Sequence, residues 1–245
     1  MQLTREQREL YNSNGFLVVP DLIPEAMLRQ VRHRISEIVE TVSRDRGARV
    51  PGKVDTEPNA AVATKPALRK LSELAYSDEF FRSVANYHAI VDIGVELTQS
   101  DGRLKLYSDQ AFLKPAFEGS EKPLHQDNSY FRITPHHAGV TCWIAVDDST
   151  VENGCMRYIA GSHKLGLLPH KAISAAHLTP EVNFKLGEEV AVPIPAGAEI
   201  FHHLLTLHSS GANTSPKSRR AWALHLANPA GESPVRPWTD MLDLR

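Results

Sequence analysis

Apolar residues recur at helical spacing in the first hundred residues of the chain. The clearest case follows Pro24, which suits the first turn of a helix. Its apolar positions lie three or four residues apart: Met27, Leu28, Val31, Ile35 and Ile38. This spacing predicts an amphipathic helix that packs one face on a core. We also expect a short helix capped by Thr4, a strand over residues 16–19 and a further helical stretch over residues 67–97.

From residue 103 the pattern changes to short β-rich runs separated by turns. The runs predicted as strands are residues 104–113, 139–147, 156–161, 189–194, 197–203 and 220–228. Many short strands with turn signals favour a sandwich or barrel. We therefore expect a mostly β fold with flanking α-helices and a double-stranded β-helix (jelly-roll, cupin-like) core. One domain over 1–245 is expected, with a helical flank over 1–100, the barrel over 103–228 and a tail over 229–245.

Within the helical flank, between its two long helical stretches, residues 43–66 show no period and are rich in turn-forming and charged residues. A loop of this length inside a compact domain is usually either functional or disordered. Its cations Arg46, Arg49 and Lys53 are candidates to meet an anionic substrate. The alternative is a charged loop that is simply exposed to solvent.

Composition narrows the class of protein. The chain has 245 residues, of which 42% are hydrophobic and 23% charged, as in ordinary globular proteins. Its 27 Lys and Arg against 29 Asp and Glu lack the basic excess of a nucleic-acid-binding protein. The 2 cysteines exclude a disulfide scaffold. No apolar run is long enough for a membrane span and the start is polar, so we expect a cytoplasmic protein.

The most informative short pattern is a histidine and an aspartate two positions apart. In extended backbone, His125 and Asp127 point to the same face and present an imidazole beside a carboxylate. One more histidine from a distant strand completes two imidazoles and one carboxylate, the ligand set of non-haem Fe(II) oxygenases. The pattern is short and occurs often by chance, so it indicates a metal site only in combination with other features.

A second segment places an arginine near another histidine. His208 ends an apolar run, a turn-rich segment follows, and Arg219 and Arg220 open a new strand. This order predicts a hairpin with His208 and Arg219 on neighbouring strands, and alternation places Arg219 on the same face as His225. A guanidinium binds a carboxylate in bidentate fashion, and the far carboxylate of 2-oxoglutarate is such a group. The alternative is an exposed arginine pair before a strand.

Three strings follow one another in the second half of the chain: LHQDNSYF, CWIAVDDSTVENGCMRYIAGSHKLG and HSSGANTSPKSRRA. Together they resemble the phytanoyl-CoA dioxygenase family, over about residues 14–228. The resemblance implies an enzyme that uses Fe(II), 2-oxoglutarate and O₂. It implies that His125, Asp127 and His208 are the iron ligands and that Arg219 binds the 5-carboxylate of 2-oxoglutarate. The presence of Asp127, rather than Gly or Ala, disfavours halogenation.

The same resemblance implies further residues around the cosubstrate. Trp143 matches an aromatic beside it, Ser210 a polar residue near its carboxylate, and Gln110 a position that lines its pocket. Lys70 matches, after a small gap in the alignment, a lysine that reaches the cosubstrate. Residues that follow the iron motif or share a face with Arg219 are candidates for the substrate pocket: Asn128, Tyr130, Phe131 and His225.

The expected reaction is hydroxylation of an unactivated C–H bond of a small metabolite, with release of succinate and CO₂. Desaturation, epimerisation or ring formation at the same iron site stay open, as does a non-catalytic cupin-like module that binds a metal or ligand. A zinc hydrolase is less favoured because no general-base glutamate is placed near the ligands. We expect no nucleic-acid or membrane partner, and a monomer or homodimer.

The chain has 12 histidines, which first suggests a metal-rich protein. Apart from the two implied iron ligands and His225, we interpret them as ordinary surface or capping residues. This group includes the pairs at 136–137 and 202–203, and His33 and His88 on predicted helices.

Overall fold

The computed structural model describes residues 2–56, 67–174 and 177–245. Its helices are α1 (Arg5–Asn14), α2 (Glu25–Arg44), α3 (Leu74–Ser77), α4 (Glu79–Ala85), α5 (His88–Leu97) and α6 (Asn128–Phe131). Its strands are β1 (Phe16–Val19), β2 (Lys53–Thr56), β3 (Leu68–Ser72), β4 (Leu104–Lys114), β5 (Lys122–His125), β6 (Gly139–Ala145), β7 (Met156–Tyr158), β8 (His170–Ala172), β9 (Leu178–Pro180), β10 (Val190–Val192), β11 (Glu199–His203), β12 (His208–Ser210), β13 (Arg219–Ala227) and β14 (Leu242–Leu244).

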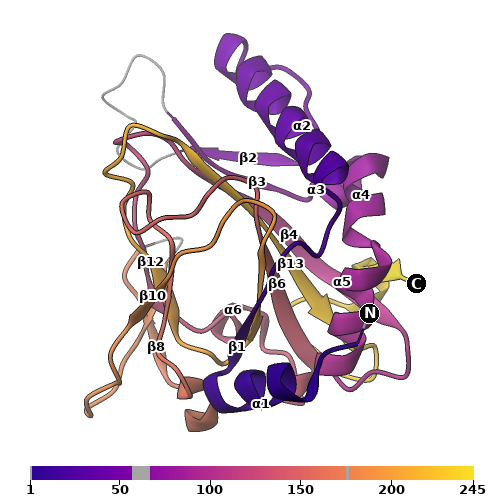
Figure 1. Ribbon diagram of the computed structural model, residues 1–245, viewed down its shortest axis with the longest axis vertical. Coiled ribbons are helices and arrows are strands. Elements are labelled where there is room, and N and C mark those ends of the chain that lie inside the picture. Colours follow the sequence, from indigo (N-terminus) through magenta and orange to yellow (C-terminus); the bar gives the residue numbers. More distant parts are fainter. Residues whose placement is uncertain (1, 57–66, 175–176) are drawn as a thin grey trace.

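Two antiparallel sheets form the body of the fold (Figure 1). The larger runs in the order β1-β11-β6-β13-β4-β3-β2, with β14 also paired to β4, and the smaller runs in the order β10-β7-β12-β5. One buried apolar cluster joins their inner faces, since it includes Trp143 of β6 and Ala223 of β13 together with Met156 and Tyr158 of β7. The sheets therefore pack face to face, which confirms the predicted jelly-roll, cupin-like fold.

The helices cover the outer face of the larger sheet (Figure 1). Alternation along β13 turns Trp222 and Leu224 outward, into the main core cluster that α2, α4 and α5 complete. Phe81 of α4 packs edge-on against Trp222 with ring centroids 5.3 Å apart. Trp222 Nε1 donates a hydrogen bond to Asp109 Oδ1 at 3.0 Å, so its polar atom is satisfied inside this core. Burial of an aromatic side chain contributes roughly 2–3 kcal/mol.

Local signals at the start of the chain act as the sequence predicts. Thr4 Oγ1 accepts a hydrogen bond from the Gln7 backbone N–H, and the Gln7 side chain accepts one from the Thr4 N–H, which completes a capping box. Gly15 ends α1 in the left-handed conformation, with φ of 81°. The chain can then enter β1, which adds an edge strand to β11. Pro24 precedes the first residue of α2 and leaves no backbone N–H unsatisfied there.

The prediction of one helical stretch over residues 67–97 is wrong at its start. Leu68–Ser72 form strand β3, which pairs with β2 on one side and β4 on the other. Leu68 and Leu71 are both buried, so their three-residue spacing resembles one face of a helix although the backbone is extended. Pairing to β4 over the register Lys70–Phe112 and Leu71–Ala111 overrides the local pattern.

The predicted loop over residues 43–66 is also partly structured, because Lys53–Thr56 form β2. Residues 57–66 of that loop lie outside the described part of the chain. Within the described part, none of the helices combines the length and apolar composition that crossing a membrane requires. The organisation as one domain and the monomeric or dimeric state stay predictions.

Candidate active site

A cavity of roughly 370 Å³ between the two sheets collects most of the residues predicted from sequence. Its size falls within the range typical of small-molecule sites. The predicted residues that line it are His125, Asp127, His208, Arg219, Trp143, Ser210, Gln110, Lys70, Tyr130, Phe131 and His225. The cavity therefore brings together elements that are far apart in sequence, from β3 and β4 to β12 and β13.

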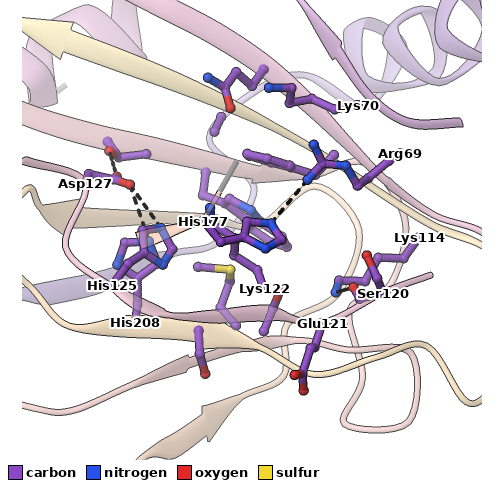
Figure 2. A pocket seen from close by; sticks show the side chains of 18 of the residues that line it. Arg69, Lys70, Lys114, Ser120, Glu121, Lys122, His125, Asp127, His177 and His208 are labelled. Carbon is purple, nitrogen blue, oxygen red and sulfur yellow. Dashed lines mark hydrogen bonds and ion pairs between the residues drawn. The ribbon is translucent and has the colours of Figure 1, made fainter. Parts of the chain in front are cut away.

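His125, Asp127 and His208 meet at one end of this cavity (Figure 2). His125 ends β5 and His208 begins β12, and the two residues pair directly across these antiparallel strands. Their ring centroids are therefore only 4.2 Å apart. Asp127 Oδ1 lies 3.5 Å from Nε2 of each histidine, so the candidate ligand atoms all fall within 4.8 Å of one another.

The backbone reason for this convergence differs from the predicted one. The strand ends at His125, and Asp127 has helical dihedrals, with φ of −57° and ψ of −37°. Its carbonyl accepts hydrogen bonds from two residues of α6, Tyr130 N–H at 2.9 Å and Phe131 N–H at 3.3 Å. A strand-to-helix turn, rather than extended alternation, therefore brings the carboxylate beside the imidazole.

Both histidines are held in the tautomer that a metal requires. The Nδ1–H of His125 donates to the Pro123 carbonyl at 2.8 Å, and that of His208 donates to the Thr206 carbonyl at 2.9 Å. Each Nε2 is left as a lone-pair donor directed at the triad. Burial lowers the pKa of both rings, so they are neutral near pH 7. Neutral imidazole is the form that binds metal ions.

The carboxylate of Asp127 is oriented by hydrogen bonds to Oδ2, the oxygen that faces away from the two imidazoles. Its Oδ2 accepts hydrogen bonds from Thr141 Oγ1 at 2.7 Å and from His202 Nε2 at 3.0 Å. His202 Nδ1 in turn accepts a hydrogen bond from the Tyr158 hydroxyl at 3.0 Å. This chain of bonds leaves Oδ1 directed at the two imidazoles. Two imidazoles and one carboxylate with oriented lone pairs fit an Fe(II) site with positions open for other ligands.

The interpretation of His202 as a surface or capping residue is therefore wrong, because only 1% of it is exposed and it contacts a candidate ligand. The signal was present in the sequence. His202 lies two positions after Ile200 on the predicted strand over residues 197–203, and alternation places both on one face. Ile200 belongs to the inner apolar cluster, so that face is the inward one.

Arg219 lines the same cavity, but not by the predicted hairpin. Strand β12, which carries His208, pairs with β5 and β7, whereas β13, which carries Arg219, pairs with β4 and β6. The two residues therefore lie on different sheets that face the same cavity. The predicted face was right, since Arg219 and His225 both line the cavity, whereas Arg220 forms a two-point ion pair with Asp147 on the outside.

The Arg219 guanidinium is buried without a counter-charge. Only 1% of the residue is exposed, and none of the ion pairs within the described ranges involves it. Its Nη2 donates to the Gly154 carbonyl at 2.7 Å, its Nε has no hydrogen-bond partner, and its Cζ lies 5.4 Å from the Trp143 ring centroid. Burial lowers its pKa to about 10, so it stays charged at pH 7. A buried cation of this kind needs an anion, such as a bound carboxylate.

Three predicted substrate residues do not line the cavity. Asn128 is buried behind it, where its side chain accepts from Ile133 N–H and donates to the Ile133 carbonyl, so it shapes the turn after α6. Arg46 and Arg49 are exposed beyond the end of α2. Neither arginine borders the cavity, so their assignment to substrate binding stays a prediction.

Sequence reasoning missed another group of residues on the cavity wall: Arg69, Lys122 and His177 (Figure 2). His177 follows the undescribed residues 175–176 and lies directly before β9. No local pattern singles out these three positions, because they come from separate elements that meet only when the sheets close. Lys70, next to Arg69, forms an ion pair with Asp55 at 3.0 Å.

Fold and site together define a jelly-roll protein with a non-haem iron type of centre, and comparison with known proteins agrees. A model of the phytanoyl-CoA dioxygenase family matches residues 11–221. The chain belongs to this family. The probable phytanoyl-CoA dioxygenase of Caenorhabditis elegans is 26% identical over 242 residues, covering 92% of this chain and 76% of the relative. The peroxisomal phytanoyl-CoA dioxygenase of Homo sapiens is 27% identical over 237 residues, covering 92% and 69%.

Solved structures share the fold. EctD from S. alaskensis, with 2-oxoglutarate and 5-hydroxyectoine, gives a TM-score of 0.76 at 19% identity over 96% of this chain and 82% of that one. EvdO2 from Micromonospora carbonacea var. aurantiaca, complexed with 2-oxoglutarate, gives a TM-score of 0.73 at 24% identity, over 97% of this chain and 95% of that one. The epimerase SnoN, with Fe³⁺ and α-ketoglutarate, gives a TM-score of 0.72 at 20% identity, over 95% of this chain and 86% of that one. These structures share the predicted fold, the family model confirms the predicted enzyme class, and the His-Asp-His triad fits the predicted Fe(II) site.

Proposed function

We propose that this enzyme hydroxylates an unactivated C–H bond of a small-molecule metabolite and couples this to conversion of 2-oxoglutarate into succinate and CO₂. One observation supports this most strongly. The cavity holds three converging ligand atoms and, on another wall, a buried arginine without a counter-ion. A metal site alone does not need that arginine, whereas a metal-bound dicarboxylate does.

In this proposal, His125 Nε2, Asp127 Oδ1 and His208 Nε2 hold Fe(II), and Arg219 receives the far carboxylate of 2-oxoglutarate. Fe(II) with bound 2-oxoglutarate supplies, on reaction with O₂, an oxidant for an unactivated C–H bond. Three further side chains border the same space and are assigned to the cosubstrate: Trp143, Ser210 and Gln110. Lys70 is assigned there as well, although in this structure it is paired with Asp55.

The rest of the protein's contribution is orientation and exclusion of water. Backbone carbonyls fix the two imidazoles, and Thr141 and His202 fix the carboxylate before any ligand arrives. Trp143 and Arg219 are both almost fully buried, so the cosubstrate end of the cavity is shielded from bulk solvent. Preorganised ligands of this kind need no rearrangement when metal and cosubstrate bind. No acid–base pair from the protein is needed.

The direct test is an anaerobic titration of the protein with Fe(II) and 2-oxoglutarate, followed by exposure to air with small-metabolite mixtures. We expect a weak visible charge-transfer band and then succinate in proportion to oxidised product. His125→Ala should lose both, whereas His33→Ala, on the exposed side of α2, should keep both. A protein that binds both compounds without the band, or forms no succinate, contradicts the proposal.

Mass analysis of the product separates hydroxylation from the other outcomes of the same site. A gain of one oxygen atom supports hydroxylation, a loss of two hydrogen atoms indicates desaturation or ring formation, and an unchanged mass indicates epimerisation. The fold does not choose among them, since its structural neighbours include the carbocyclase SnoK and the epimerase SnoN. A cytoplasmic location and a monomer or homodimer remain our predictions for this enzyme.

A further inference from the structure

A group of cationic and imidazole side chains lies on one wall of the cavity, apart from Arg219. It consists of Arg69 on β3, Lys122 at the start of β5 and His177 just before β9, and we call it the basic cluster (Figure 2). Arg69 Nη1 lies 3.4 Å from His177 Nε2. Burial lowers the pKa of His177 to about 4, and Lys122 and Arg69 act in the same direction, so the positive charge of the cluster comes from the arginine and the lysine.

Tyr130 holds the cluster against the candidate metal centre. Its hydroxyl accepts hydrogen bonds from Lys122 Nζ at 3.2 Å and from Leu178 N–H at 2.8 Å, which ties β5 to β9. The Lys122 ammonium also lies 5.0 Å from the Tyr130 ring centroid, and that ring packs edge-on against His125 at 5.8 Å. The cluster is therefore a built part of the cavity, one ring away from a metal ligand.

The positive charge of this cluster is only partly compensated. Asp55 pairs with Lys70 at 3.0 Å and is 3.7 Å from Arg69, while Lys122 has no ion pair within the described ranges. Arg69 Nε is buried without a hydrogen-bond partner. Glu121 also borders the cavity, but it is exposed and its carboxylate points away from the cluster (Figure 2). Burial lowers the pKa of Lys122 to about 8, which is the effect expected of a cation that lacks a close counter-ion.

The proposed cofactors do not use up this charge. Fe(II) and Arg219 together balance Asp127 and the two carboxylates of 2-oxoglutarate. None of the proposed cofactors supplies an anion to the basic cluster, which lines the same cavity as the candidate metal ligands. We propose that Arg69, Lys122 and His177 bind an anionic group, a carboxylate or a phosphate, of the molecule that the enzyme oxidises. This inference rests on the proposed function, since it assigns the cosubstrate to Arg219.

Equilibrium binding of simple probes tests the inference. The protein is loaded with Ni(II), which prevents turnover, and with saturating 2-oxoglutarate, whose own binding is measured first. Hexanoate and hexyl phosphate are then compared with hexanamide and hexanol by calorimetry. We expect at least one of the two anions to bind roughly tenfold or more tighter than its neutral partner. The better anion identifies the group as carboxylate or phosphate.

Variants assign the effect to the cluster. Arg69→Gln and Lys122→Gln should each weaken the binding of the preferred anion roughly 10- to 100-fold. The affinities for the neutral probes and for 2-oxoglutarate should stay unchanged. The matched control is Arg103→Gln, which removes an exposed arginine paired with Asp101 outside the cavity and should change nothing. The wild-type comparison of anionic with neutral probes needs no variant, so it stands even where a variant folds poorly.

Two results overturn the inference while the proposed function stands. One is tight 2-oxoglutarate binding with no preference for either anion over its neutral partner. The other is a loss of 2-oxoglutarate binding in Arg69→Gln or Lys122→Gln as large as the loss of the anion, because the cluster then belongs to the cosubstrate. Failure of the wild-type protein to bind 2-oxoglutarate overturns the proposed function itself.

Discussion

His202 Nε2 donates to Asp127 Oδ2 across 3.0 Å, to the carboxylate oxygen that is not shared with the two ligand imidazoles. This bond joins β11 of the larger sheet to the turn that follows β5 of the smaller sheet. The orientation of one candidate metal ligand therefore depends on how the two sheets pack. His202, which is not itself one of the three candidate ligands, thereby sets the geometry of Asp127, which is.

The first prediction concerns this bond. His202→Leu removes the donor to Asp127 Oδ2 and leaves the carboxylate free to rotate, so the affinity for Fe(II) or Ni(II) should fall roughly 10- to 100-fold. Anaerobic calorimetry measures the loss. His33→Leu, at an exposed position of α2, serves as the control and should bind metal as the wild type does. Unchanged metal affinity in folded His202→Leu would show that the bond does not orient the ligand.

The second prediction separates two adjacent arginines. Arg219→Met removes the buried cation assigned to 2-oxoglutarate, so the affinity for that cosubstrate should fall roughly 30-fold or more. The free energy of unfolding of the ligand-free protein should not fall by more than about 1 kcal/mol, because an unpaired buried charge is itself destabilising. Cosubstrate titration and urea unfolding measure the two effects.

Arg220→Met is the matched control for that experiment. Arg220 pairs with Asp147 through two bonds and also donates to Ser36 Oγ, all on the outer face of the sheet. Its loss should destabilise the protein by about 1–3 kcal/mol and leave 2-oxoglutarate binding unchanged. The reverse pattern, with Arg220 needed for the cosubstrate and Arg219 for stability, is incompatible with the assignment.

The third prediction concerns pH and a buried carboxyl outside the active site. Burial raises the pKa of Glu199 to about 8, and its Oε1 has no hydrogen-bond partner. The ordinary pKa of a glutamate is near 4.5. Above that pH the unfolded state has released its proton at Glu199, whereas the folded state still holds it up to about pH 8. The contribution of Glu199 to the free energy of unfolding is therefore fully present below about pH 4.5. It falls by a few kcal/mol as the pH rises from there through 8.

Glu199→Gln isolates that effect, because an amide has no proton to lose. Urea unfolding between pH 5 and 9 should show that the variant loses less stability than the wild type as the pH rises. The control is Glu37→Gln on the exposed face of α2, which should follow the wild-type curve. Parallel curves for Glu199→Gln and the wild type would place the Glu199 pKa near its ordinary value.

Features set by short-range rules could be predicted from the sequence. The spacing of Val31, Ile35 and Ile38 identifies the buried face of α2, and all three lie in the main core. Alternation along β13 separates Arg219, which faces the cavity, from Arg220, which faces out. These predictions hold because the period of a helix or strand does not depend on what packs against it.

Features set by strand pairing could not be predicted in the same way. The order of His208, a turn and Arg219 looks like a hairpin, yet their strands belong to different sheets. Residues 68–72 have helical spacing but pair with β4, and the free energy of that pairing comes from partners some forty positions away. The basic cluster depends on the same long-range closure, since β3, β5 and the segment before β9 carry no shared motif.

The most direct test of the account is a crystal structure of the protein with Fe(II) and 2-oxoglutarate, prepared without oxygen, with anomalous data at the iron edge. We expect one anomalous peak bound by His125 Nε2, Asp127 Oδ1 and His208 Nε2, with the far carboxylate of 2-oxoglutarate on the Arg219 guanidinium. An iron peak away from this triad, or a cosubstrate carboxylate bound elsewhere with Arg219 still unpaired, would contradict it.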